Sequence, residues 1–137
     1  MPPKKIKTKA VDRSDYKIYL KKANEFYDTM IQAKERKKWN TVGLNAVHCA
    51  ISSSDAMLIF YKGIRSTNDS HLTVIDLLNS INFTEIKSKC MTLRRILVKK
   101  NLIEYENRDF TQKEAFEIFK RTKRFYNWVI SKIGKSL

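Results

Sequence analysis

Residues 45–56 have the sequence NAVHCAISSSDA and lie in the middle of an apolar segment that runs from Asn40 to Ile64. Apolar residues recur along this segment at intervals of three and four, which is the spacing of a helix face that packs against a core. Its middle is rich in alanine and serine, and small side chains let a neighbouring helix approach closely. The sequence therefore predicts that residues 40–64 form the most central helix of a helical bundle.

Further helices are predicted on both sides of this segment, because the same apolar spacing continues along the chain. A capping-box pattern, in which a polar residue precedes Glu by three positions, marks two of the helix starts. It occurs at Asn82 with Glu85 and at Thr111 with Glu114. The expected fold class is all-α: an up-and-down antiparallel bundle of four long helices plus one short helix. The long helices are expected over residues 14–38, 40–64, 82–105 and 112–132, and the short one over 71–78.

The composition suits a single helical domain. The 137 residues are 42% hydrophobic, with only three Gly and two Pro, and both prolines stand at the N-terminus. No run approaches the roughly 20 apolar residues of a membrane span, and no apolar segment follows the basic N-terminus. The two cysteines lack CxxC spacing, so we expect buried reduced thiols and no metal site. We also expect no cofactor, no membrane partner and a cytoplasmic location. Residues 1–12 are expected to form a flexible basic arm and residues 13–137 one domain.

The chain is strongly basic, with 28 Lys and Arg residues against 14 Asp and Glu residues and a formal net charge of +14. A field of this sign favours RNA, DNA or an acidic protein as a partner. A lysine-rich proteome gives the same composition without any polyanion ligand. The basic arm has two interpretations as well, because its lysines can contact phosphates or simply keep the protein soluble.

The candidate site lies in residues 91–110, MTLRRILVKKNLIEYENRDF. On a helix, spacings of three and four bring an amine, an amide, a carboxylate, a phenol and a guanidinium to neighbouring positions. The candidate catalytic side chains are those of Lys100, Glu104, Tyr105 and Arg108. The nucleic-acid or nucleotide-binding candidates are Arg94, Arg95, Lys99, Lys100, Asn101 and Arg108. The alternative interpretation is a solvated helix face whose last turn carries cations because they suit the helix dipole.

Two polar residues stand out on the expected central helix, His48 and Asp55, and both are predicted to be buried there. A buried Asp55 needs a partner, for which a cation or a hydroxyl from another helix is expected. His48 and Cys49 are adjacent, but neighbours in sequence do not face each other on a helix, so they do not suggest a Cys–His nucleophile. No phosphate-binding glycine loop, dinucleotide fingerprint, zinc motif or RNA-binding signature is present.

Three pieces of the sequence, taken in this order, resemble the HEPN superfamily of small helical proteins. They are the Ala/Ser-rich segment that ends in Asp55 and Ala56, the block KNLIEY at residues 100–105, and the helix start FTQKEA followed by RFYNWV. The resemblance covers about residues 14–133 and implies a helical bundle that is often a homodimer. Many members are metal-independent ribonucleases of toxin or defence systems, frequently paired with a nucleotidyltransferase-like partner.

The resemblance also implies a site made of an Arg and a His four to six residues later, in which the His exchanges protons and the Arg stabilises phosphate charge. This chain departs from that pattern. Lys100 stands at the Arg position and Tyr105 at the His position, while His48 and His71 belong to other helices. We therefore expect a dimeric RNA-, nucleotide- or partner-binding module with a degenerate ribonuclease site. The alternatives are a ribonuclease toxin with a variant Lys/Tyr site, and a structural adaptor for an acidic protein in which Glu104 and Arg108 pair.

Overall fold

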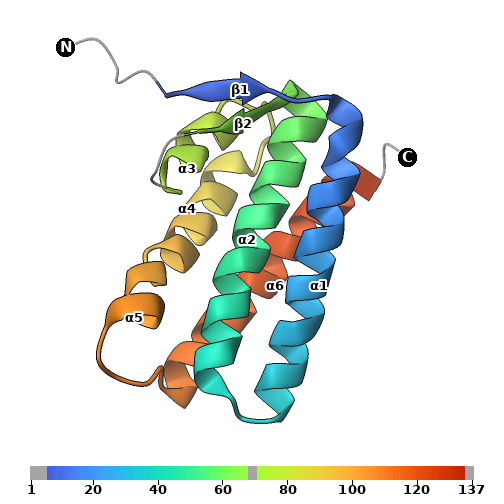
Figure 1. Ribbon diagram of the computed structural model, residues 1–137. Helices are drawn as coiled ribbons and strands as arrows, with labels where there is room; N and C mark the ends of the chain where they lie inside the picture. The colour runs from blue at the N-terminus through green and yellow to red at the C-terminus, as the bar shows by residue number, and fades with distance from the viewer. Residues whose placement is uncertain (1–5, 68–70, 135–137) are drawn as a thin grey trace, which may run out of the picture.

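The computed structural model describes residues 6–67 and 71–134, and these form a helical bundle (Figure 1). The predicted all-α antiparallel fold is confirmed. Four helices are long, namely α1 (Tyr16–Glu35), α2 (Trp39–Lys62), α4 (Ile86–Leu97) and α6 (Gln112–Gly134). The shorter elements are the 3₁₀ helix η1 (Arg13–Asp15), α3 (Thr73–Leu78), α5 (Lys100–Tyr105), and the strands β1 (Thr8–Ala10) and β2 (Ile64–Ser66).

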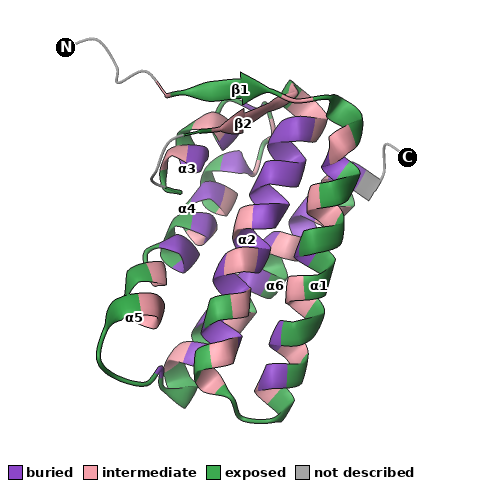
Figure 2. Ribbon diagram, in the orientation of Figure 1, coloured by how far each residue is buried: buried purple, intermediate pink, exposed green. Residues whose placement is uncertain are grey.

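The small-residue helix α2 is central, as predicted. It contacts α1, α3, α4, α5 and α6, and it is buried along most of its length (Figure 2). Gly43 shows why small residues matter here. A Cβ atom at this position would lie 2.9 Å from Ile103 Cδ1 and 3.0 Å from the Phe110 ring, closer than packed atoms approach. The missing side chain therefore lets α5 and the turn before α6 pack directly on α2.

Among the described residues, α2 alone has the length and apolar composition to cross a membrane, which the sequence analysis did not expect. However, 78% of the apolar window in this helix is buried inside the bundle. Its apolar surface is therefore already covered by the neighbouring helices, as in the central helix of a folded core.

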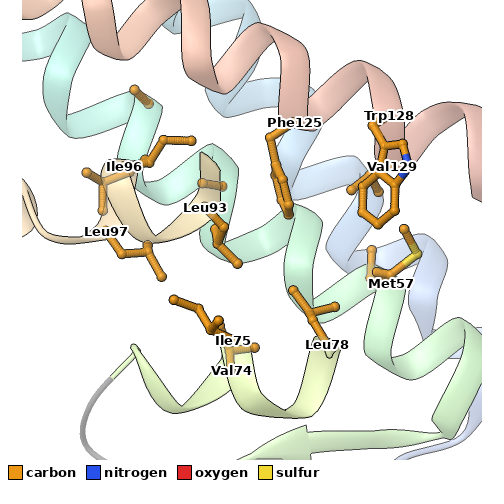
Figure 3. Packing of buried hydrophobic residues seen from close by; sticks show 14 of the residues in the cluster. Met57, Val74, Ile75, Leu78, Leu93, Ile96, Leu97, Phe125, Trp128 and Val129 are labelled. Atoms are coloured by element: carbon orange, nitrogen blue, oxygen red, sulfur yellow. The ribbon is translucent and has the colours of Figure 1, made fainter. Parts of the chain in front are cut away.

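The main core lies where α2, α3, α4 and α6 meet. In Figure 3, Leu93 of α4 and Phe125 of α6 approach Leu78 of α3, and Ile96 lies farther along α4 beside Leu97. All of these side chains except Leu97 have no more than 2% of their surface exposed. Full burial of one such side chain contributes about 1.5–3 kcal/mol to stability, so this junction fixes how α3 and α4 sit on the bundle. Eight residues of α6 that recur at spacings of three and four are buried or half-buried: Ala115, Ile118, Phe119, Thr122, Phe125, Tyr126, Val129 and Ile133.

The predicted helix over residues 82–105 is wrong in its extent, because it is two helices. The helix α4 ends at Leu97, and the chain makes a tighter turn, in which the Lys99 amide donates to the Ile96 carbonyl, before α5 begins. Val98 is half exposed at the break, and beyond it Leu102 and Ile103 pack against the core. The turn thus redirects the chain so that the short helix α5 lies against α2.

The capping-box prediction holds at one helix start and fails at the other. At α6, the Thr111 amide donates to Glu114 Oε1 and the Glu114 amide donates to Thr111 Oγ1, at 3.0 and 3.1 Å. At α4 no side chain caps the helix start. Glu85 instead accepts hydrogen bonds from Trp128 Nε1 at 2.9 Å and from Lys132 Nζ at 2.7 Å, which ties the start of α4 to α6.

A small antiparallel ribbon corrects the prediction of a flexible arm over residues 1–12. The strands β1 and β2 pair in the register Thr8 with Ser66, Lys9 with Arg65 and Ala10 with Ile64. The chain can enter β2 because Gly63 ends α2 in the left-handed conformation, with φ of 64°. Residues 8–10 are therefore attached to the bundle, while residues 1–5 of the predicted arm lie outside the described residues.

Candidate functional site

The helix α5 carries the first part of the predicted site. Lys100 Nζ donates to Glu104 Oε2 at 2.9 Å, one turn apart on the same helix. This hydrogen bond raises the pKa of Lys100 and lowers the pKa of Glu104. The Tyr105 side chain is 74% exposed, and the Lys100 ammonium lies 5.9 Å from its ring centroid. Amine, carboxylate and phenol are thus together as predicted, and the exposed Asn101 is on the same short helix.

Arg108 does not join this group. It lies beyond the end of α5, and its guanidinium donates to both carboxylate oxygens of Glu114 at 2.8 Å and to the Asp109 carbonyl at 3.0 Å. The possible pairing of Glu104 with Arg108 is therefore wrong, because each residue has another partner. Arg108 therefore stabilises the turn before α6. The five predicted groups divide into two separate clusters.

The remaining binding candidates lie on the last turns of α4 and on the break that follows. Arg94 and Arg95 are exposed, and Lys99 is half-buried at the start of α5. Among the ion pairs of the described residues, none involves these three side chains. Their charges therefore face solvent without a neighbouring carboxylate, close in sequence to Lys100.

The polar residues of the central helix differ in their surroundings. Asp55 is buried, as predicted, with 7% of its surface exposed. Its Oδ2 atom lies 3.4 Å from Arg65 Nη2, so the expected cation is present but comes from the strand β2. Burial raises the pKa of Asp55 and the nearby charges of Arg65 and Lys22 oppose that shift. His48 is half-buried, not buried, and its ring lies against Phe26 at 5.4 Å between centroids.

The thiol beside His48 shows no sign of activation. Burial raises the pKa of Cys49 to about 12 and that of Cys90 to about 11, so both remain protonated thiols at neutral pH. Both cysteines are free and buried, as the sequence predicted. In the parts of the chain that the structure describes, no three His, Cys, Asp or Glu side chains group as metal ligands.

His71 is one of two titratable pocket residues that the sequence analysis did not include among its site candidates. It is exposed and lies at the rim of a pocket of about 220 Å³ that Asp55 and Arg65 also line. Partial desolvation is the largest cause that lowers the pKa of His71. The charges of Lys100, His48 and Arg65 lower it further, and Glu104 acts in the opposite direction. The structure therefore brings residues of α2, β2, the start of α3 and α5 within electrostatic reach of one another.

Arg65 was missed for the same reason as His71. Both stand in or beside a polar segment, GIRSTNDSH, whose composition predicts only a loop. A lone Arg in such a loop carries no spacing signal. The one available clue was the predicted need of a buried Asp55 for a cation, which the sequence could not assign to a particular residue.

Comparison with known proteins places these features in a family context. The family model of the HEPN domain matches residues 16–133, from the first residue of α1 to the last turn of α6. No curated protein and no solved structure matches the chain. The matched range contains the whole bundle, including Lys100, Glu104, His71 and Arg65, and excludes β1.

Proposed function

This chain belongs to the HEPN domain family, and we propose that it works as a homodimeric RNA- or nucleotide-binding module of a toxin–antitoxin or defence-type system. In this proposal the usual ribonuclease site of the family is degenerate. The module acts in the cytoplasm, and a nucleotidyltransferase-like protein is its expected partner.

The observation that carries the proposal is the run of cations at the junction of α4 and α5. Arg94 and Arg95 are exposed, and these two and Lys99 are absent from the ion pairs of the described residues. The whole chain has a formal net charge of +14. Unpaired cations on a basic protein attract nucleic-acid phosphates and release the counterions that surround them. An RNA or nucleotide phosphate is therefore the ligand that this surface suits best.

The chemistry of α5 supports binding in preference to cleavage. Tyr105 stands where the family resemblance places His, and a phenol has an ordinary pKa of about 10, far from the value near 7 that suits acid–base catalysis. Lys100 stands at the Arg position, but its ammonium is held by Glu104 at 2.9 Å. An ammonium also lacks the two-pronged geometry with which a guanidinium grips phosphate.

One observation favours the alternative of a metal-independent ribonuclease with a variant site. His71 lies within electrostatic reach of Lys100, and its lowered pKa favours the neutral imidazole, which is the form that accepts a proton. In this alternative His71 is the base and Lys100 stabilises phosphate charge, in place of the Lys/Tyr pair.

The adaptor alternative rests on the turn before α6. Arg108 and Glu114 make a bidentate ion pair there, which is a structural role for one of the predicted site residues. Exposed apolar side chains on α4 and just after it, Met91 and Val98, offer a surface for a second copy or a partner protein. An acidic protein is the partner that the net charge suits.

RNA binding by the purified protein tests the proposal and separates it from both alternatives. A labelled single-stranded RNA is titrated with protein at low and at physiological salt, and the RNA is then run on a denaturing gel. We expect salt-dependent binding with the RNA intact. Binding followed by RNA cleavage, which His71→Gln abolishes, would establish the ribonuclease alternative instead. No binding at low salt would favour the adaptor alternative.

A further inference from the structure

A pocket of about 220 Å³ lies between the middle of α2, the strand β2 and the start of α3. Pockets for drug-sized ligands typically measure about 300–1,000 Å³, so this one suits a single small group. Two apolar side chains, Ile51 and Val74, form part of its wall. The rest of the lining is polar: Asp55, Arg65, Ser66, Thr67 and His71.

Arg65 is held in this pocket with hydrogen-bonding capacity to spare. Its Nη2 atom lies 3.4 Å from Asp55 Oδ2, which is a long single contact, not a bidentate pair. Its guanidinium carbon lies 4.7 Å from the centroid of the Tyr19 ring, so the group is stacked on one side. Its Nε atom is buried and has no acceptor among the described residues. The Arg65 side chain as a whole is 30% exposed, so the guanidinium N–H groups that Asp55 does not take are open to a bound anion.

The pocket is basic despite the carboxylate inside it. Arg65 lines it, the charge of Lys22 acts on Asp55, and the charge of Lys100 acts on His71, where Glu104 opposes it. Asp55 is buried and already faces Arg65. The carboxylate therefore serves mainly to hold the guanidinium, while the cations around it favour an anion.

We propose that this pocket binds a phosphomonoester, the terminal phosphate of an RNA chain or of a free nucleotide. The inference rests on the RNA- or nucleotide-binding function proposed above and names the group that is recognised. A guanidinium, an imidazole and a hydroxyl, at Arg65, His71 and Thr67, are donors whose hydrogen bonds phosphate oxygens accept. A small pocket admits the end of a chain, whereas a phosphodiester inside a chain needs an open groove with two exits.

Asp55 takes part in this recognition by accepting a hydrogen bond from a protonated phosphate. Its carboxylate faces Arg65 and lies within reach of the Lys22 charge, and His71 shares the pocket. A phosphomonoester has a second pKa of about 6, so near neutral pH it still carries a proton part of the time. That P–OH group donates to the Asp55 carboxylate, which converts a repulsive contact into a hydrogen bond.

The test compares two RNAs of identical sequence, one with a 5′-phosphate and one with a 5′-hydroxyl, by fluorescence anisotropy. Titration calorimetry with inorganic phosphate, a nucleoside 5′-monophosphate and the free nucleoside separates the sources of the phosphate. We expect the phosphorylated RNA to bind at least about tenfold tighter, which is the worth of one charge-assisted hydrogen bond. His71→Gln and Thr67→Val alter exposed pocket residues, so both variants should fold and both should reduce this preference.

Arg65→Gln should abolish the preference, and circular dichroism shows whether this variant keeps its helices. Lys120→Gln, at an exposed cation of α6, is the matched control and should leave the preference unchanged. If both RNAs bind equally, the pocket inference is overturned while the RNA-binding function stands. If neither RNA binds but the nucleoside monophosphate does, and Arg65→Gln abolishes that binding, the pocket inference stands and the RNA-binding function fails. If no phosphate compound binds at all, both are overturned.

Discussion

The Arg108 guanidinium donates one hydrogen bond to each carboxylate oxygen of Glu114, both at 2.8 Å, across the turn that leads into α6. The same carboxylate accepts the Thr111 amide at 3.0 Å, so one side chain closes the helix cap and anchors the turn. The hydrogen bond from Arg108 is the largest cause that lowers the pKa of Glu114 to about 2. A group whose pKa is lowered by folding stabilises the fold above its unfolded pKa and loses that contribution as the pH falls.

Glu114→Gln should destabilise the protein at pH 7 by about 0.5–1 kcal/mol, because a Gln keeps the capping box but loses the ion pair. The difference in the free energy of unfolding between this variant and the native protein should disappear between pH 4.5 and about 2, where the native carboxylate takes up its proton. Urea unfolding across this pH range measures it. Glu117→Gln, at an exposed position of the same helix, is the control. A difference that persists unchanged at pH 2 would contradict the assignment.

Arg108→Ala should lower the free energy of unfolding at pH 7 by about the same amount, since it removes the other partner of the pair. It should leave the affinity for RNA unchanged, because the guanidinium is already occupied by Glu114. Parallel urea unfolding and anisotropy measurements on one preparation give both quantities. A large drop in RNA affinity without a loss of stability would mean that Arg108 belongs to the RNA-binding surface.

Gly43→Ala should destabilise the fold, although alanine favours a helix by about 1 kcal/mol over glycine. The added methyl group would lie 2.9 Å from Ile103 Cδ1 and 3.0 Å from the Phe110 ring, and overpacking of this kind costs about 1–3 kcal/mol. Combining the change with Ile103→Val removes the nearest clashing atom and should recover part of the loss. Thermal unfolding of the two variants and of Ile103→Val alone tests this, and a Gly43→Ala protein more stable than the native one would refute the close approach.

The sequence predicted the bundle well because helix spacing and small residues are local signals. The start of the last helix at residue 112 was predicted correctly, because the capping box of Thr111 and Glu114 is a local signal. The helix break at Val98 was missed because nothing local forbids a helix there. It follows from the packing of Leu102 and Ile103, which is tertiary.

The site was predicted less well than the fold for a related reason. The Lys100–Glu104 pair lies within one helix, so its spacing of four was readable from the sequence. Arg65 meets Asp55 across ten residues and a change of direction at Gly63, and His71 reaches the field of Lys100 from the turn before α3. Contacts of that kind depend on how the elements pack, and no spacing rule gives them from one sequence.

Asp55→Asn should be at least as stable as the native protein at pH 7. Burial raises the pKa of Asp55, so its ionised form costs stability in the folded state, while the carbonyl oxygen of an Asn can still accept the hydrogen bond from Arg65. Because the folded pKa is raised, the native protein gains stability as the pH falls through that pKa, and the advantage of the Asn variant should shrink. Urea unfolding between pH 7 and 4 measures this gap. An Asn variant that is less stable at pH 7 would show that the ion pair with Arg65 outweighs desolvation.

Replacing Arg94 and Arg95 together by Gln should weaken RNA binding and also make it less sensitive to salt. Each phosphate contact to single-stranded nucleic acid contributes about 0.7 to the slope of log K against log salt, so losing two contacts should reduce the slope by about 1.4. Both residues are exposed on α4, and removing charge from such positions should leave the unfolding temperature nearly unchanged. The affinity is measured by anisotropy at several salt concentrations. The pair Lys120→Gln and Lys123→Gln, two exposed cations of α6, removes the same charge from another helix and should change the slope far less. Equal slopes for the two double variants would mean that RNA responds to the net charge of the protein and not to the cations at the end of α4.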